Sequence, residues 1–222
     1  MIEMLYEFWG KAGLYMPFLL TGLKLTLIVT VGSLAVATVL GCVWAIIRYL
    51  EVPVLSPLVA AFVNMLRGIP ILVQLYFIYF VAPQIGLSLT SMQAAIFGIG
   101  IGYSVYHAEN YRAALLAVDK GQTEAAKSIG MSWFLTLRRV VIPQAIPIAL
   151  PSWGNMAVMM LKDSSLASTI TVAELAFQGR VLASSTFDNS TIYILVSALY
   201  MSICLPLLFL VNKLEKRARP AR

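Results

Sequence analysis

Charged side chains stand inside or at the ends of long apolar runs in this sequence, and they are the residues whose chemistry needs an explanation. Arg67 and Glu109 fall within or near the ends of two such runs, and Lys162 and Asp163 close a third. A charged side chain at the centre of a bilayer costs roughly 2.5–3.5 kcal/mol on the insertion scale. Each charge therefore has either a function in the membrane or a place at its surface. For Arg67 and Glu109 two interpretations stay open: a functional site, or an interfacial pair formed with each other or with His107.

The reactive side chains of the sequence do not form a catalytic or metal site. Ser104 and His107 lie one helical turn apart, but no orienting third group or Gly-x-Ser-x-Gly context accompanies them. His107 is the one histidine, and Cys42 and Cys204 lie in separate apolar runs, so no metal ligand set is predicted. The sequence also has no Gly-x4-Gly-Lys-Ser/Thr loop, so we do not expect the chain to bind and hydrolyse ATP itself.

The composition is that of a polytopic membrane protein. Hydrophobic residues make up 60% of the 222 residues and charged residues 12%, where a soluble domain has roughly twice that charged fraction. Residues 1–22 contain aromatic residues and no cleavable leader pattern, which favours an interfacial segment. We predict one all-α domain over residues 1–222 with about five transmembrane helices. Their approximate bounds are 25–47, 58–81, 92–116, 144–161 and 190–212.

The distribution of basic residues predicts how these helices are oriented. If there are five crossings, twelve of the 16 Lys and Arg residues fall on one side, with the central loop 117–143 and the C-terminal tail. Because Lys and Arg accumulate on the cytoplasmic side of membrane proteins, this predicts an outside N-terminus and a cytoplasmic C-terminus. The net charge of +6 then needs no nucleic acid partner to explain it.

The sequence of the central loop 117–143 predicts two short helices. Asp119 and Gln122 have the spacing of a capping box, which predicts a helix start at that point. Ala125, Ala126 and Ile129 would form a small apolar face on this first helix. Side chains of that size allow the backbone to approach a partner groove closely.

The second half of the loop starts at a glycine. Gly130 predicts a break with a positive φ angle, and Ser132 is a suitable N-cap for a second helix over 133–141. Pro143 is expected to end that helix. The following span contains Pro147 and Pro151, which predict a bent helix.

The loop also carries a family resemblance. Glu124-Ala125-Ala126, then Gly130, then Ile142-Pro143 resembles the EAA loop of ABC importer permeases. The segments around it, His107 to Arg112, Leu150 to Asn155 and Leu161 to Leu166, resemble the polar amino acid uptake branch, and the likeness runs from about Phe18 to the C-terminal tail.

This resemblance implies a type I ABC importer permease-like fold and a multi-subunit machine in the bacterial cytoplasmic (inner) membrane. The expected partners are two ATPase subunits that hydrolyse ATP with magnesium, a second permease chain, an extracytoplasmic solute-binding protein and the membrane lipid. The chain itself would bind no cofactor. The residues that it implies for coupling to the ATPase are Glu124, Ala125, Ala126, Gly130 and Pro143.

A polar amino acid substrate would need both signs of charge on its path. Lys162 and Asp163 with Ser165 supply them at a helix end, although a helix-end salt bridge is an alternative for this pair. The remaining candidates for the path are Arg67, Glu109 and Glu174. Two other functions stay open: a secondary transporter or channel that is not coupled to ATP, and a membrane enzyme. The first lacks a clear internal repeat, and the second lacks a catalytic constellation.

Overall fold

The computed structural model describes residues 2–218, with side chains from 6 to 216, and this part of the chain contains helices and no strand. The α-helices are α1 (Ile2–Tyr49), α2 (Leu55–Arg67), α3 (Ile71–Tyr76), α4 (Ser91–Leu116), α5 (Lys120–Ser128), α6 (Trp133–Thr136), α7 (Ile142–Asp163), α8 (Leu175–Thr186) and α9 (Asn189–Ala218). Shorter segments join them: the π-helices η1 (Phe77–Val81) and η3 (Leu137–Val141), and the 3-10 helices η2 (Ala82–Ile85) and η4 (Ser164–Ile170).

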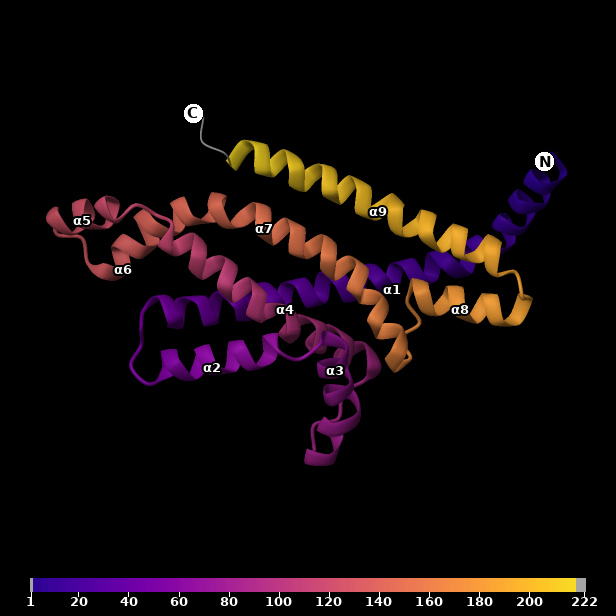
Figure 1. The fold of residues 1–222 in the computed structure, drawn as a ribbon, viewed down its shortest axis with the longest axis horizontal. Coiled ribbons are helices and arrows are strands. Elements are labelled where there is room, and N and C mark those ends of the chain that lie inside the picture. Colours follow the sequence, from indigo (N-terminus) through magenta and orange to yellow (C-terminus); the bar gives the residue numbers. More distant parts are fainter. Residues whose placement is uncertain (1, 219–222) are drawn as a thin grey trace.

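The molecule is elongated, and its long helices run along it. In Figure 1, α5 and α6 lie at one end, while α8 and the start of α1 lie toward the other. Helix α9 begins near α8 and ends toward α5 and α6. The chain therefore starts at one end of the molecule and finishes toward the other.

Within residues 2–218, three helical stretches are long and apolar enough to cross a membrane: Tyr6–Tyr49, Trp133–Ile170 and Asn189–Lys216. The α2/α3 pair supplies a fourth if its two arms count as one span. Helix α4 has 26 residues and packs along α1 in the middle of the molecule. The membrane bundle agrees with the predicted fold class.

The helices differ from the predicted segments at two places. Residues 2–22 and the first predicted span, 25–47, lie in one continuous helix, α1 from Ile2 to Tyr49. Its first half is held by packing, because Ala12, Tyr15 and Leu19 are buried against α8 and α9. The second span is not straight: α2 and α3 are bent by 103° at residues 68–70.

The central loop 117–143 follows the prediction at its two helix starts and at Gly130. Asp119 caps α5 by accepting a hydrogen bond from the Gly121 amide at 2.7 Å. Gly130 has φ +80°, the left-handed conformation that glycine tolerates best. Ser132 caps α6, where its Oγ accepts a hydrogen bond from Leu135 N at 3.4 Å.

Two details of the loop are wrong in the prediction. Gln122 does not complete a capping box with Asp119, because its Oε1 accepts a hydrogen bond from Gln144 Nε2 at 3.4 Å. Pro143 does not end the second loop helix, because α6 continues through η3 into α7. Pro143 is the second residue of α7 and directly follows the π-helical turn η3. The other two prolines lie inside α7, which curves along its length in Figure 1.

Candidate functional site

The α5–α6 corner exposes large apolar side chains. Ile129 is 79% exposed, Phe134 66% and Trp133 44%. Ala125 is also exposed, but Ala126 is 5% exposed, on the side of α5 that faces the rest of the chain. The predicted alanine face is therefore split: one alanine points outward and the other packs inward. An exposed apolar corner of this kind is typical of a surface that a partner covers.

A cluster of four charged residues joins three helices. Glu109 of α4 is paired with Arg48 at the end of α1, with Arg112 at 3.4 Å and with Arg67 at the end of α2 at 3.9 Å. We call these four residues the Glu109 cluster. Three guanidinium groups surround one carboxylate, so the cluster keeps a surplus of positive charge. The expected pairing of Glu109 with Arg67 is present, although Arg48 is the closer partner.

His107 does not belong to this cluster. Its side chain is fully buried between α1 and α4, and neither ring nitrogen has a hydrogen-bond partner within the part of the chain that the structure describes. The imidazole lies against the Tyr111 ring, with the centroids 5.5 Å apart. Ser104 donates its hydroxyl proton to Ile101 O at 2.7 Å. The pair therefore has the geometry of helix packing and not that of a nucleophile with its base.

Lys162 and Asp163 lie at the end of α7, and their side chains have different environments. Asp163 accepts a hydrogen bond from Tyr103 Oη on α4 at 2.7 Å. Lys162 is exposed, and among residues 6–216 it has no acidic group within salt-bridge distance. The salt-bridge alternative for this pair is therefore wrong. Ser165 donates its hydroxyl proton to Lys162 O at 2.8 Å.

Glu174 lies inside the bundle, at the start of α8. It was placed on the substrate path, but its side chain is fully buried and caps α8. Its carboxylate accepts hydrogen bonds from Ala176 N at 3.0 Å, Phe177 N at 2.8 Å, Tyr200 Oη at 2.9 Å and Thr26 Oγ1 at 3.3 Å. Burial raises the pKa of the Glu174 carboxyl, and these hydrogen bonds oppose that rise. A carboxylate with this set of donors is a structural cap.

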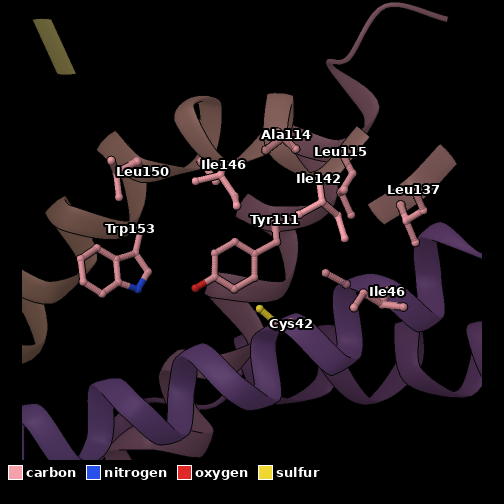
Figure 2. A pocket seen from close by; sticks show the side chains of 13 residues that line it. Cys42, Ile46, Tyr111, Ala114, Leu115, Leu137, Ile142, Ile146, Leu150 and Trp153 are labelled. Atoms are coloured by element: carbon pink, nitrogen blue, oxygen red, sulfur yellow. The ribbon is translucent and has the colours of Figure 1, made fainter. Parts of the chain in front are cut away.

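Sequence reasoning did not find the apolar cavity of about 300 Å³ between α1, α4, η3 and α7. Figure 2 shows it extending from Leu137 to Trp153, with Cys42 and Tyr111 between them. Trp153 donates its indole proton to Thr38 Oγ1 at 3.0 Å. None of the predicted site residues lines it. The signal in the sequence was the spacing of small residues, Ala145 and Ala149, on one face of α7.

Three kinds of comparison place the chain among known proteins. The family model described as "Binding-protein-dependent transport system inner membrane component" matches residues 37–220. The chain is 36% identical over 201 residues, 90% of this chain and 89% of the relative, to the probable amino-acid ABC transporter permease protein YckA of Bacillus subtilis (strain 168).

A second relative and a solved structure cover nearly the whole chain. The glutamine transport system permease protein GlnP of Escherichia coli (strain K12) is 34% identical over 213 residues, which are 95% of this chain and 97% of that protein. A solved structure described as an amino acid ABC transporter with histidines has a TM-score of 0.85 and 33% identity. It covers 93% of this chain and 97% of its own.

Proposed function

The chain belongs to the family of binding-protein-dependent transport system inner membrane components, and we propose that it is the permease subunit of an ATP-driven importer for a polar amino acid. The observation that carries the proposal is the α5–Gly130–α6 corner. It joins α4 to α7, and it exposes Ile129 and Phe134 where a partner would bind. Two short helices fixed between two long ones can transmit a displacement, which a flexible linker would absorb.

The proposed complex has two permease chains, identical or paralogous, and two ATPase subunits that hydrolyse ATP with magnesium. An extracytoplasmic solute-binding protein would deliver the amino acid. The coupling residues are Glu124, Ala125 and Gly130, which lie on or beside the exposed corner, together with Ala126 and Pro143, which support it. The chain itself would remain without a cofactor.

The proposed topology has five crossings, by α1, the α2/α3 pair, α4, α7 and α9. The N-terminus would then lie outside and the α5–α6 corner with the C-terminal end of α9 in the cytoplasm of a bacterial inner membrane. The opposite placement of the start of α1 and the end of α9 supports an odd number of crossings. Single cysteines at Thr123 and Lys216 should react with an impermeant reagent from the same side. Reaction from opposite sides would overturn this topology.

For the substrate path we propose Asp163 and Lys162 at the end of α7, with Ser165 and the Arg67 side of the Glu109 cluster. Asp163 is held in place by Tyr103 and offers a negative charge to an ammonium group, while exposed Lys162 offers a positive charge to a carboxylate. Asp163→Asn and Lys162→Ala are expected to lower uptake about tenfold with normal membrane levels, as for the loss of one charged contact. Unchanged kinetics in both variants would remove them from the path.

The experiment that tests the function is uptake by proteoliposomes that contain the whole complex. We expect accumulation of a polar amino acid that requires ATP and is lost in Gly130→Leu, since leucine strains a φ of +80°. A panel of acidic, amide and basic amino acids then identifies the substrate. Uptake that persists without ATP or without the ATPase subunits would favour a secondary transporter instead.

A further inference from the structure

The bend between α2 and α3 has a specific construction. The chain bends by 103° between the two arms, over Gly68, Ile69 and Pro70, which we call the elbow. Pro70 has no amide proton to continue the helix. Two amides of the elbow do bond backward, since Gly68 N lies 3.1 Å from Met65 O and Ile69 N lies 3.2 Å from Leu66 O. A carbonyl left without a donor inside a membrane is strongly unfavourable, so the elbow needs further donors.

Gln74 supplies a donor to Ile69 O, and a second donor to Leu66 O beside Ile69 N. Its Nε2 donates to Leu66 O at 2.9 Å and to Ile69 O at 2.8 Å, so one amide group of α3 binds the end of α2 and the elbow together. The side chain is 7% exposed. On its other side Gln74 faces α4, where a Cβ on Gly102 would lie 3.2 Å from Oε1. The side-chain amide of glutamine carries two N–H donors on one nitrogen. Leucine and methionine have side chains of similar size but no hydrogen-bond donor.

The residue that this arrangement holds in place is Arg67. It is the last residue of α2 and directly precedes the elbow. Its Nη1 lies 3.9 Å from Glu109 Oε1, while Glu109 is also paired with Arg48 and Arg112. The Arg67 side chain is 45% exposed, so much of its charge faces outward from the cluster. The direction of α2 where it ends decides where that charge lies.

We propose that Gln74 is a positioning residue of the translocation path: by binding Leu66 O and Ile69 O it locks the elbow, and thereby sets the position of Arg67 against Glu109. This inference rests on the proposed function, to which it adds a residue that acts from inside the bundle. Gln74 does not touch the substrate; it acts through Arg67, whose surplus positive charge would meet the carboxylate of an amino acid in transit.

The transport test is a double-mutant cycle on the whole complex in proteoliposomes. Gln74→Leu should lower the ratio of the maximum uptake rate to KM about tenfold, with a normal amount of the permease in the membrane. Arg67→Ala should lower it by the same factor. Because both act on one interaction, the double variant should be no slower than Arg67→Ala alone. Asn64→Leu is the control, since Asn64 is an exposed amide on α2, the helix that ends at Arg67, and it should transport like the unmodified chain. Independent losses that multiply, or normal uptake by Gln74→Leu, would overturn the proposal.

A second measurement does not depend on transport. Spin labels at Leu58 and Phe80, which are exposed on the two arms of the bend, report the angle after Cys42 and Cys204 are replaced. The unmodified elbow should give one narrow distance distribution, and Gln74→Leu a broad or shifted one. An unchanged distribution would contradict the role of Gln74.

If Gln74→Leu does not accumulate in the membrane, Gln74→Met is the alternative variant, because it keeps the side-chain length and lacks the donors. If no variant, including the unmodified chain, takes up an amino acid with ATP, the proposed function fails while the distances still decide on the elbow.

Discussion

The two ends of the molecule differ in whether their side chains find partners within the chain. Around Glu174, every polar partner is inside the chain: two backbone amides, a threonine and a tyrosine surround one buried carboxylate. At the α5–α6 corner, Ile129 and Phe134 are largely exposed, and no side chain among residues 6–216 covers them. The first region is complete by itself, and the second has the character of half an interface.

This difference separates residues that build the permease from residues that would operate it. A change in the complete region should lower the stability of the subunit, and uptake only as a consequence. A change at the exposed corner should lower coupled uptake and leave the isolated subunit intact. Variants in the two regions can therefore be compared by measuring stability and uptake on the same preparations.

The largest effect should come from removing the carboxylate at the complete end. Glu174→Ala leaves two amides and two hydroxyl groups without their acceptor in a buried site. Since one unsatisfied buried group costs about 1–3 kcal/mol, the free energy of unfolding should fall by about 4 kcal/mol or more, measured by denaturation of the purified subunit in detergent. Glu174→Gln keeps the shape and should lose about half as much. A Glu174→Ala subunit of normal stability that fails to transport would put this residue back on the substrate path.

The two neighbouring alanines of α5 test the comparison within one turn of helix. Ala126 is buried, so Ala126→Trp should lower the free energy of unfolding by about 2 kcal/mol, as for an overpacked site. Ala125 is exposed, so Ala125→Trp should keep normal stability and lose association with the ATPase. Co-purification of the ATPase together with a thermal melt measures both. Equal behaviour of the two variants would mean that the corner has no outer docking face.

The sequence predicted those features of the fold that depend on neighbours along the chain. The Gly130 corner was predictable because a glycine between two short helical segments, with Ser132 next to it, has few other conformations. Asp119 was likewise predictable as a cap from its own side chain. Both features are decided within a few residues, whereas Gln122, the other half of the predicted capping box, bonds to Gln144 from a distant helix.

The features that were missed depend on distant residues. Gly68 and Pro70 can interrupt a membrane helix without ending the span, so the sequence alone did not predict a bend of 103° or the amide of Gln74 across it. The burial of Glu174 was missed because a charge in a polar segment does not indicate burial. Its partners Thr26 and Tyr200 lie 148 and 26 residues away in the sequence. Neither contact leaves a periodic pattern that sequence analysis can recognise.

At the exposed corner, Phe134→Ala should lower coupled uptake about tenfold, the change that about 1.4 kcal/mol of lost binding to the ATPase produces. The side chain is 66% exposed in the isolated subunit, so its own stability should not change. Phe209→Ala is the control, because Phe209 is 71% exposed on the membrane-spanning α9 and lies outside the corner. ATP-dependent uptake and the affinity for the ATPase measure the effect. A loss of stability in Phe134→Ala would show that the corner is a packed part of this subunit.

The smallest effect should come from a single hydroxyl at the complete end. Tyr200→Phe removes the hydrogen bond of 2.9 Å to Glu174 and keeps the ring. The carboxylate still accepts bonds from the two amides that start α8 and from Thr26. Because the net contribution of one such bond is about 1 kcal/mol, the free energy of unfolding should fall by about that amount.

Uptake by Tyr200→Phe should be unchanged, since the cap of α8 is retained. Tyr193→Phe is the matched control, because that tyrosine is 47% exposed on the same helix, and it should have no effect on stability. Denaturation in detergent and the uptake assay on the same preparation give both values. If Tyr200→Phe transported poorly at normal stability, the hydroxyl would belong to the working part of the permease, and the complete end would not be purely structural.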